Sequence, residues 1–427
     1  MSLARHAERD ALGDRFAEIR EVSRRLCEPL ALEDYVVQPV PEASPPKWHL
    51  AHTTWFFETF LLKPLLPRYT VFHPGYEYLF NSYYNGVGQQ FPRAERGRLS
   101  RPTVAEILDY RAHVDEAMAR LLDRDVPEIV SRTVLGLHHE QQHQELLITD
   151  LKANLGTNPL APAYVTATRS SAPADAAARE LGFVSFAGGL VEIGAAADVE
   201  FCFDNERPRH SVHLVPFALA DRLVTCEDYL AFMADGGYET PSLWLSDGWR
   251  WVQSNGGQAP LYWSRGDGGW QEYRLTGQVP VVGAAPVTHI CAYEADAFAR
   301  WAGYRLPTEA EWEAAAERTP PRGHFADSGL FHPQPAGEEA RVEVEGLLSQ
   351  LFGDTWEWTS SSYGAYPGYQ PLAGTLGEYN GKFMANQLVL RGGSCATPAD
   401  HVRASYRNFF YPSDRWQFTG IRLAKDA

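Results

Sequence analysis

The sequence lacks the features of membrane, secreted and nucleic-acid-binding proteins. No apolar run approaches the roughly 18 residues that a membrane helix needs, and the N-terminal stretch "MSLARHAERDALGDRF" is too polar for a secretory signal. The 5 cysteines are scattered without paired spacing, so we expect reduced thiols and a cytoplasmic location. With 38 Lys and Arg against 54 Asp and Glu, the net charge of −16 argues against nucleic acid as a partner.

What is present divides the chain into two parts, as its 427 residues also suggest. Residues 1–157 hold four amphipathic segments, which predict a four-helix bundle. For one of them we expect Ser100 as the N-cap and Pro102 near the first turn, and another ends near Gly156. The segments are "RFAEIREVSRRLCEPL", "HTTWFFETFLL", "SRPTVAEILDYRAHVDEAMARLLDRD" and "PEIVSRTVLGLHHEQQHQELLITDLKANL".

A stretch rich in Ala, Pro and Ser, residues 158–180, predicts a linker to a second domain over residues 181–427. In this second part short apolar runs alternate with Gly, Pro, Asn and Asp. Only "CAYEADAFARWAG" and "TEAEWEAAAE" read as helical, so we expect a loop-rich domain with limited regular structure. The fold class predicted for the whole chain is α+β.

The last of the four bundle segments contains "HHEQQH", in which His139, Glu140 and His143 form the pattern H-E-x-x-H. On a helix His139 and His143 face the same side one turn apart and can bind one metal ion. His138 points about 100° away from them. The pattern is typical of zinc proteases, where the glutamate is the general base.

Two observations count against a zinc protease. In the extended zinc-protease motif a glycine and a third histidine follow, but Leu146 and Thr149 stand at those positions. Upstream, "PPKWHLAHTTWFFETF" offers His49 and His52 at the start of another bundle helix. Three neutral histidines would leave several coordination positions open, which suits iron(II) that binds O2 and a substrate together.

Several motifs then point to a known family. "WHLAHTTWFFETF", "YLFNSYYNGVG", "FPRAERGRLSRPT" and "HHEQQHQELL" resemble the DinB-like domain of the ergothioneine-biosynthesis sulfoxide synthases, also called hercynine oxygenases. "FDNERPRHSVHL", "FGDTWEWTSS" and "VLRGGSCA" resemble the C-type-lectin-like fold of formylglycine-generating (sulfatase-modifying-factor) enzymes. Formylglycine chemistry needs a cysteine pair after "RGGS", whereas only Cys395 is present here, and we interpret it as structural.

The resemblance implies a metal site and a reaction. The iron ligands of the family correspond to His52, His139 and His143, so His49 and His138 are left out. The implied cofactor is Fe(II), and the implied reaction joins C2 of hercynine to the sulfur of a thiol, with O2, to give a sulfoxide. Both substrates together supply the four electrons, so no separate reductant is needed.

The resemblance also implies residues for the thiol. Arg93 and Arg96 match the arginines that hold the thiol substrate, and the planar fork of arginine suits its carboxylate. Tyr83 and Tyr84 match tyrosines that part of the family places in the active site, where a phenol could donate a proton. Taken alone, this tyrosine pair would more often indicate core packing.

The run "YRNFFYPSDRWQ" matches the hercynine-binding segment of the family. Asn408 would bind the carboxylate of hercynine and Phe409 would face its trimethylammonium group. Enzymes that use γ-glutamylcysteine often carry Asp at the position of Phe410, and a basic residue where this chain has Asp414 beside Arg415. These departures favour cysteine as the thiol.

Other functions remain open at this point. Ovothiol-type relatives couple histidine with cysteine but usually carry an added methyltransferase domain, and selenoneine-forming relatives use hercynine and a selenosugar. From a different class, the chain could be a binding protein that holds a metal or ligand without catalysis. The sequence alone also leaves the oligomeric state and a calcium ion in the second domain open.

Overall fold

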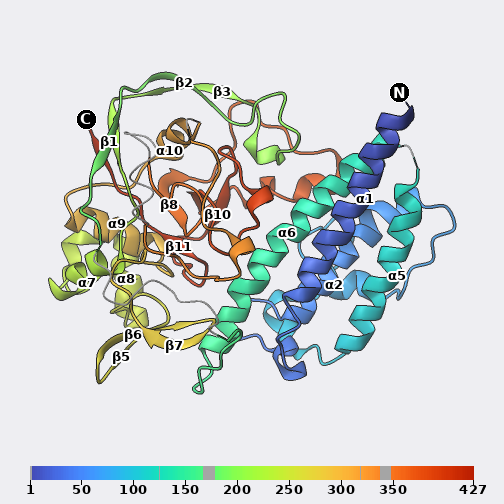
Figure 1. The fold of residues 1–427 in the computed structure, drawn as a ribbon, viewed down its shortest axis with the longest axis horizontal. Helices are drawn as coiled ribbons and strands as arrows, with labels where there is room; N and C mark the ends of the chain where they lie inside the picture. The colour runs from blue at the N-terminus through green and yellow to red at the C-terminus, as the bar shows by residue number, and fades with distance from the viewer. Residues whose placement is uncertain (1, 125, 167–177, 318, 337–347) are drawn as a thin grey trace. The chain divides into compact units, whose positions relative to one another are not determined.

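The computed structural model describes residues 2–124, 126–166, 178–317, 319–336 and 348–427. It divides into two compact units: Met1–Leu160 with Ala373–Tyr379, and Ala161–Leu372 with Asn380–Ala427 (Figure 1). Of the expected linker 158–180, residues 167–177 lie outside the described residues. Helices and strands together give the α+β class that the sequence predicts. No helix in the described ranges has the length and apolarity to cross a membrane.

The first unit is helical, and four of its helices are long enough to form the bundle. A π-helical turn continues the second of them, and short 3-10 turns lie in the connections. Its elements are α1 (Ser2–Arg25), η1 (Leu32–Val36), α2 (Pro46–Phe57), η2 (Glu58–Leu62), α3 (Lys63–Leu65), α4 (Tyr76–Phe80), η3 (Arg93–Arg98), α5 (Val104–Leu122), α6 (Pro127–Gly156) and η8 (Gly374–Glu378).

Helix α2 is the centre of this bundle, because it packs against both α5 and α6 and all of its residues are buried. A helix that is buried on every side needs apolar or well-bonded residues all round, and "PKWHLAHTTWFF" supplies them. Helix α6 ends at Gly156, as expected. The expected start of α5 was wrong: Thr103, and not Ser100, is the N-cap, because Thr103 Oγ1 accepts from the Glu106 amide while the Glu106 carboxylate accepts from the Thr103 amide.

The second unit is built from small sheets with helices packed beside them. The strand orders are β1-β4-β12, β10-β9-β8-β11, β2-β3 and β5-β6-β7, and all pairs are antiparallel except β8 with β11. The strands are β1 (Phe183–Phe186), β2 (Gly189–Ile193), β3 (His210–Leu214), β4 (Phe217–Ala220), β5 (Trp263–Gly266), β6 (Gly269–Arg274), β7 (Gly277–Pro280), β8 (Trp356–Ser362), β9 (Leu388–Arg391), β10 (Asn408–Phe410), β11 (Thr419–Gly420) and β12 (Ala424–Asp426).

Helices of the second unit agree only in part with the sequence prediction. The two expected helices are α9 (Ala292–Trp301) and α10 (Glu309–Ala316). The structure adds α7 (Cys226–Ala234) and α8 (Ser246–Asn255), which the sequence analysis did not predict. Helix α10 contributes Trp312, which is fully buried and forms one core of this unit together with residues such as Phe217 and Phe352.

Residues Ala373–Tyr379 group with the helical unit although the chain around them belongs to the second unit. Both flanks of this segment are held within the second unit by one carboxylate, that of Asp204. It accepts hydrogen bonds from the Leu372 amide at 3.3 Å and from Asn380 Nδ2 at 2.7 Å. The sequence analysis had assigned these residues to the second domain.

Candidate metal centre

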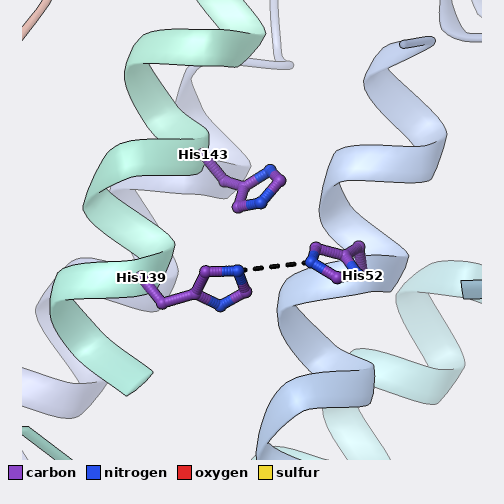
Figure 2. Close-up of side chains that lie close together, drawn as sticks. All are labelled: His52, His139 and His143. Carbon is purple, nitrogen blue, oxygen red and sulfur yellow. Dashed lines mark hydrogen bonds between the residues drawn. The ribbon is translucent and has the colours of Figure 1, made fainter. Parts of the chain in front are cut away.

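Three histidines of the helical unit point toward one another (Figure 2). His52 comes from α2, and His139 and His143 come from successive turns of α6. One ring nitrogen from each lies within 4.8 Å of the others, and across the described residues this is the group of His, Cys, Asp and Glu side chains that could hold a metal ion. His52 and His139 are buried, while His143 is half-buried.

The ring nitrogens are arranged as metal ligands require. His52 Nδ1 donates to the Phe80 carbonyl at 2.6 Å, which leaves Nε2 unprotonated. His52 Nε2 and His139 Nε2 lie 3.2 Å apart, close to the spacing of about 3 Å for neighbouring ligands at about 2.1 Å from one ion. Burial lowers the pKa of His139 to about 3 and that of His52 well below its ordinary value. The three imidazoles are therefore neutral donors, and they fit a divalent metal.

Glu140, which a zinc protease would use as its base, is occupied by structural contacts. Its carboxylate accepts from Arg20 Nη1 at 2.9 Å, from Arg111 Nη2 at 3.0 Å and from Ser23 Oγ at 2.7 Å. Burial opposes its ionisation, but the charges of Arg20 and Arg111 outweigh this and lower the pKa of Glu140 to about 2. A carboxylate that weak as a base and surrounded by donors is suited to hold helices together, not to accept a proton from water.

Stacked rings connect His52, one of the three clustered histidines, to a buried arginine. Trp48 lies parallel to His52, with ring centroids 4.6 Å apart and an angle of 11°. The guanidinium of Arg96 lies 3.3 Å from the centre of the Trp48 ring on a cation–π contact. Trp55 stacks on His52 at 5.5 Å. The positions of Arg96 and His52 therefore depend on the same indole ring.

The two arginines of "FPRAERG" differ in their surroundings. Arg96 is 3% exposed, and its hydrogen-bond partners in the described chain are the hydroxyls of Ser44 and Ser82, with Nε left unpartnered. Burial, followed by the charge of Arg93, lowers the pKa of Arg96 well below its ordinary value. Arg93 is exposed and donates to the Glu42 carbonyl. A buried guanidinium with no carboxylate in ion-pair contact is stabilised by an anion that binds to it.

Tyr83 and Tyr84 lie in a loop that Asn81 organises, because Asn81 Nδ2 donates to the Tyr84 carbonyl while Oδ1 accepts from the Tyr84 amide. Tyr84 is fully buried, and its ring packs against Trp55 and Phe60. Tyr83 is half-buried. Burial raises the pKa of its phenol, whereas the charges of Arg93 and Arg96 act in the opposite direction. Of the two, Tyr83 has the more polar surroundings and Tyr84 is typical of core packing.

A further tyrosine near the histidines was missed by the sequence analysis. Tyr379 meets the ring of His139 edge to face, with centroids 5.6 Å apart, and it lies 6.0 Å from the ring of Tyr83. Its neighbour Glu378 accepts from the backbone amides of Asn85 and Gly86 at 2.9 and 2.8 Å. No local sequence pattern marks Tyr379, because it lies far from the histidines in the chain and directly after a short 3-10 segment, Gly374–Glu378.

Comparisons with known proteins identify the family to which this chain belongs. Residues 15–147 match the DinB superfamily model, and residues 168–342 and 343–427 match the sulfatase-modifying factor enzyme 1-like domain. Hercynine oxygenase of Mycolicibacterium thermoresistibile is 33% identical, covering 90% of this chain and 88% of the relative. That of Mycolicibacterium smegmatis is 32% identical, covering 98% and 99%. The chain belongs to the hercynine oxygenase family. It is therefore an oxidoreductase that acts on small molecules.

A formylglycine-generating enzyme of Streptomyces coelicolor is 28% identical over 58% of this chain and 90% of the relative. In this chain the 5 cysteines are free, without disulfides, and Cys395 is fully buried. Burial of its side chain agrees with the structural interpretation of Cys395.

The residues that the family resemblance assigns to hercynine lie in the second unit, on strand β10. Phe409 stacks on Tyr363 with centroids 4.0 Å apart, and the Asn408 side-chain oxygen accepts from the Phe409 amide. Phe410 is half-buried and meets Trp416 edge to face. Arg415 donates to Glu294 at 3.2 Å and to the Ala259 carbonyl at 3.1 Å.

Proposed function

We propose that this protein is a non-heme iron(II)- and O2-dependent sulfoxide synthase of ergothioneine biosynthesis. It forms a bond between C2 of hercynine and the sulfur of a thiol, preferentially cysteine, and the sulfur becomes a sulfoxide. One oxygen atom of O2 enters the sulfoxide and the other leaves as water, so the two substrates supply all four electrons. The observation that carries the proposal is the neutral triad of His52, His139 and His143, connected through the ring of Trp48 to the buried guanidinium of Arg96.

The proposed metal is iron(II), held by His52, His139 and His143. Three imidazoles leave coordination positions open, which an iron ion that binds O2 and a substrate together requires and which a closed structural zinc site lacks. Bound iron would supply O2 activation and would favour the thiolate form of the substrate. The protein's part is to keep all three imidazoles neutral by burial.

We assign the thiol carboxylate to Arg96. The Nε of Arg96 has no hydrogen-bond partner in the described chain, and burial disfavours the positive charge of its guanidinium. A carboxylate would therefore form a charge-assisted, bidentate contact there. Trp48 fixes the plane of the guanidinium by stacking, which limits the directions from which a carboxylate can approach. Since Trp48 also stacks on His52, the carboxylate site and the metal are held at a fixed spacing.

Arg96→Leu should raise the KM for the thiol about ten- to a hundredfold, because a charge-assisted contact of about 1.5–3 kcal/mol is lost. The KM for hercynine should change little. Arg93→Leu is the matched control: Arg93 is exposed and already donates to the Glu42 carbonyl, so its loss should cost at most about 1 kcal/mol. Steady-state kinetics at saturating hercynine measures both. A larger effect at Arg93 than at Arg96 would contradict this assignment.

For hercynine we propose Asn408 and Phe409. The Asn408 oxygen accepts from the Phe409 amide, so the donor Nδ2 is the group of this side chain that would bind a carboxylate. Phe409 stacks on Tyr363 and, at a longer distance, on Phe383. A ring fixed in this way would offer the open part of its face to the trimethylammonium group, where cation–π attraction contributes about 0.5–2 kcal/mol.

The preference for cysteine rests on Phe410. If the amino group of γ-glutamylcysteine entered this site, it would meet at position 410 a ring that is packed on Trp416, and not the carboxylate that enzymes using γ-glutamylcysteine often carry at this position. Removing an ammonium group from water without giving it a charge partner makes the free energy of binding less favourable, and cation–π attraction to a ring face recovers only about 0.5–2 kcal/mol. Cysteine has no glutamyl arm and avoids the problem.

The experiment that tests the function is turnover by anaerobically iron-loaded protein, read by mass spectrometry of the products. Hercynine with cysteine should give the sulfoxide with a higher kcat/KM than hercynine with γ-glutamylcysteine, and Phe410→Asp should narrow the difference. Equal or better efficiency with γ-glutamylcysteine would refute the thiol preference. Turnover with neither thiol, but with a selenosugar, would replace the proposed sulfur donor.

Tyr379 is the phenol we propose as proton donor, because of its contact with the ring of His139. Tyr379→Phe keeps the ring and removes the hydroxyl, so metal content should stay normal while sulfoxide formation falls about 100-fold or more. Tyr84→Phe is the comparison, since Tyr84 packs in the core, and its sulfoxide rate should fall less than that of Tyr379→Phe. The reverse order in rapid-quench product formation would return the role to the pair predicted from sequence.

A further inference from the structure

His49 forms a link between one of the three metal-binding histidines and a buried carboxylate. It lies on α2, three positions before His52, and it is buried. Its Nδ1 is 2.9 Å from His143 Nδ1, and its Nε2 is 3.0 Å from Asp150 Oδ2. Asp150 Oδ2 also accepts from the Ser44 amide at 2.7 Å. The chain of contacts thus runs from His143 through His49 to Asp150 and ends on the backbone before α2.

The directions of these hydrogen bonds follow from what each group can do. An ionised carboxylate only accepts, so the proton between His49 and Asp150 belongs to His49 Nε2. A neutral imidazole carries one proton, and His49 Nδ1 is then an acceptor. It must accept from His143 Nδ1–H. The remaining nitrogen of His143, Nε2, is left with its lone pair, which is the form that binds a metal.

The three histidines differ in the hydrogen-bond partner of their Nδ1 atoms. His52 Nδ1 donates to a backbone carbonyl, that of Phe80. His139 Nδ1 is buried and has no hydrogen-bond partner in the described part of the chain. Among the residues that the structure describes, His143 is the one of the three that hydrogen bonds connect to a carboxylate, through His49. Partners of this kind orient a ligand imidazole, fix its tautomer and make it a stronger donor.

We propose that His49 and Asp150 are positioning residues that hold His143 in its metal-binding tautomer and raise its donor strength. This inference rests on the metal site of the proposed function, but it does not depend on which substrates are used. It also gives the first histidine of the "WHLAH" motif a role, whereas the sequence analysis left His49 without one.

The first test is the affinity of full-length protein for Co(II), measured by competition with a chromophoric chelator. His49→Ala should weaken binding about 10- to 100-fold, the usual cost of losing a partner of a metal ligand. His49→Gln should recover part of the loss, because its amide can accept from His143 and donate to Asp150. Asp150→Asn should lose less than His49→Ala, since it removes the charge but keeps an acceptor for Ser44. His138→Ala, on the other side of α6, should change affinity by no more than about twofold.

The second test observes the hydrogen bond itself. In the Co(II) protein, the Nδ1–H proton of His143 should give a strongly shifted proton resonance that exchanges slowly with water. His49→Ala should abolish it or make it exchange rapidly, while the resonance of His52 Nδ1–H remains. Melting curves of the metal-free variants show whether each is folded, and Asp150→Asn provides an independent variant if His49→Ala is not.

The inference is overturned if folded His49→Ala and Asp150→Asn bind Co(II) as tightly as the unchanged protein, or if the slowly exchanging resonance survives in His49→Ala. These readouts are separate from catalysis. If Co(II) affinity depends on His49 and Asp150 as expected but the iron-loaded protein gives no product with hercynine, the proposed function is refuted and the inference stands.

Discussion

His139→Ala should remove most of the bound iron and nearly all sulfoxide formation. His139 is one of the three proposed ligands, and its Nε2 lies 3.2 Å from His52 Nε2, so its loss leaves only two imidazoles of the triad. Losing a direct ligand should cost more than the roughly 10- to 100-fold typical of a residue behind a ligand. Metal content after anaerobic loading and desalting measures the first effect, and product mass spectrometry the second.

His138→Ala is the matched control, because it removes an imidazole from the adjacent position of the same helix. His138 contacts Arg15 at 3.4 Å and is not part of the triad. Its iron content should stay close to that of the unchanged protein. Equal loss of iron in the two variants would mean that the ligand set is wrong, and normal iron in His139→Ala would mean the same.

The metal centre could be predicted from the sequence only as far as local spacing and family resemblance reach. The i, i+4 spacing put His139 and His143 on one face of a helix, and the resemblance added His52. The role of His49 could not be found in this way, since it depends on the approach of α2 to α6. Tyr379 was out of reach for the same reason: it is brought to His139 by tertiary structure alone.

The arginines show a second limit. Arg93 and Arg96 are equivalent in the sequence motif, three residues apart on a 3-10 turn. Only the structure distinguishes them, because the burial of Arg96 results from its stacking on Trp48, a residue of another helix. Spacing predicts which face a side chain is on, but not which of two similar side chains will be covered by a neighbour.

Missed helices in the second unit have physical explanations. Helix α7 begins with a capping box, Thr225 and Asp228, which was readable in the sequence and overlooked. Helix α8 contains Gly248, which lowers helix propensity. The structure accounts for this glycine: a Cβ there would lie 2.9 Å from the side chain of Tyr293. Close packing against α9 therefore overrides the local preference.

The second large effect concerns Glu140. Glu140→Gln should lower the free energy of unfolding of the helical unit by about 3 kcal/mol at neutral pH, since breaking a buried ion pair leaves uncompensated charge. The carboxylate is 0% exposed and bridges Arg20 of α1 and Arg111 of α5 from its position on α6. Glutamine can still accept from these donors, but it cannot balance two guanidinium charges. Urea unfolding followed by far-UV circular dichroism measures the change.

The sign of the pH dependence follows from the pKa of Glu140, which falls from 4.5 to about 2 on folding. The folded state holds the ionised form more tightly than the unfolded state does. Its contribution to stability is therefore present above pH 4.5 and is lost as the pH falls toward about 2. The difference in stability between the unchanged protein and Glu140→Gln should be largest near neutral pH and should narrow through this window.

Glu128→Gln is the matched control for this substitution. Glu128 is also on α6, but its ion pair with Arg132 is partly exposed, with the glutamate side chain 51% accessible. Such a pair contributes only about 0.3–0.5 kcal/mol, so the control should unfold almost like the unchanged protein.

Activity distinguishes the two roles of Glu140. If it only holds the bundle together, folded Glu140→Gln keeps part of its turnover and most of its iron. A variant with unchanged stability and no turnover would instead make Glu140 the general base that the H-E-x-x-H motif first suggested.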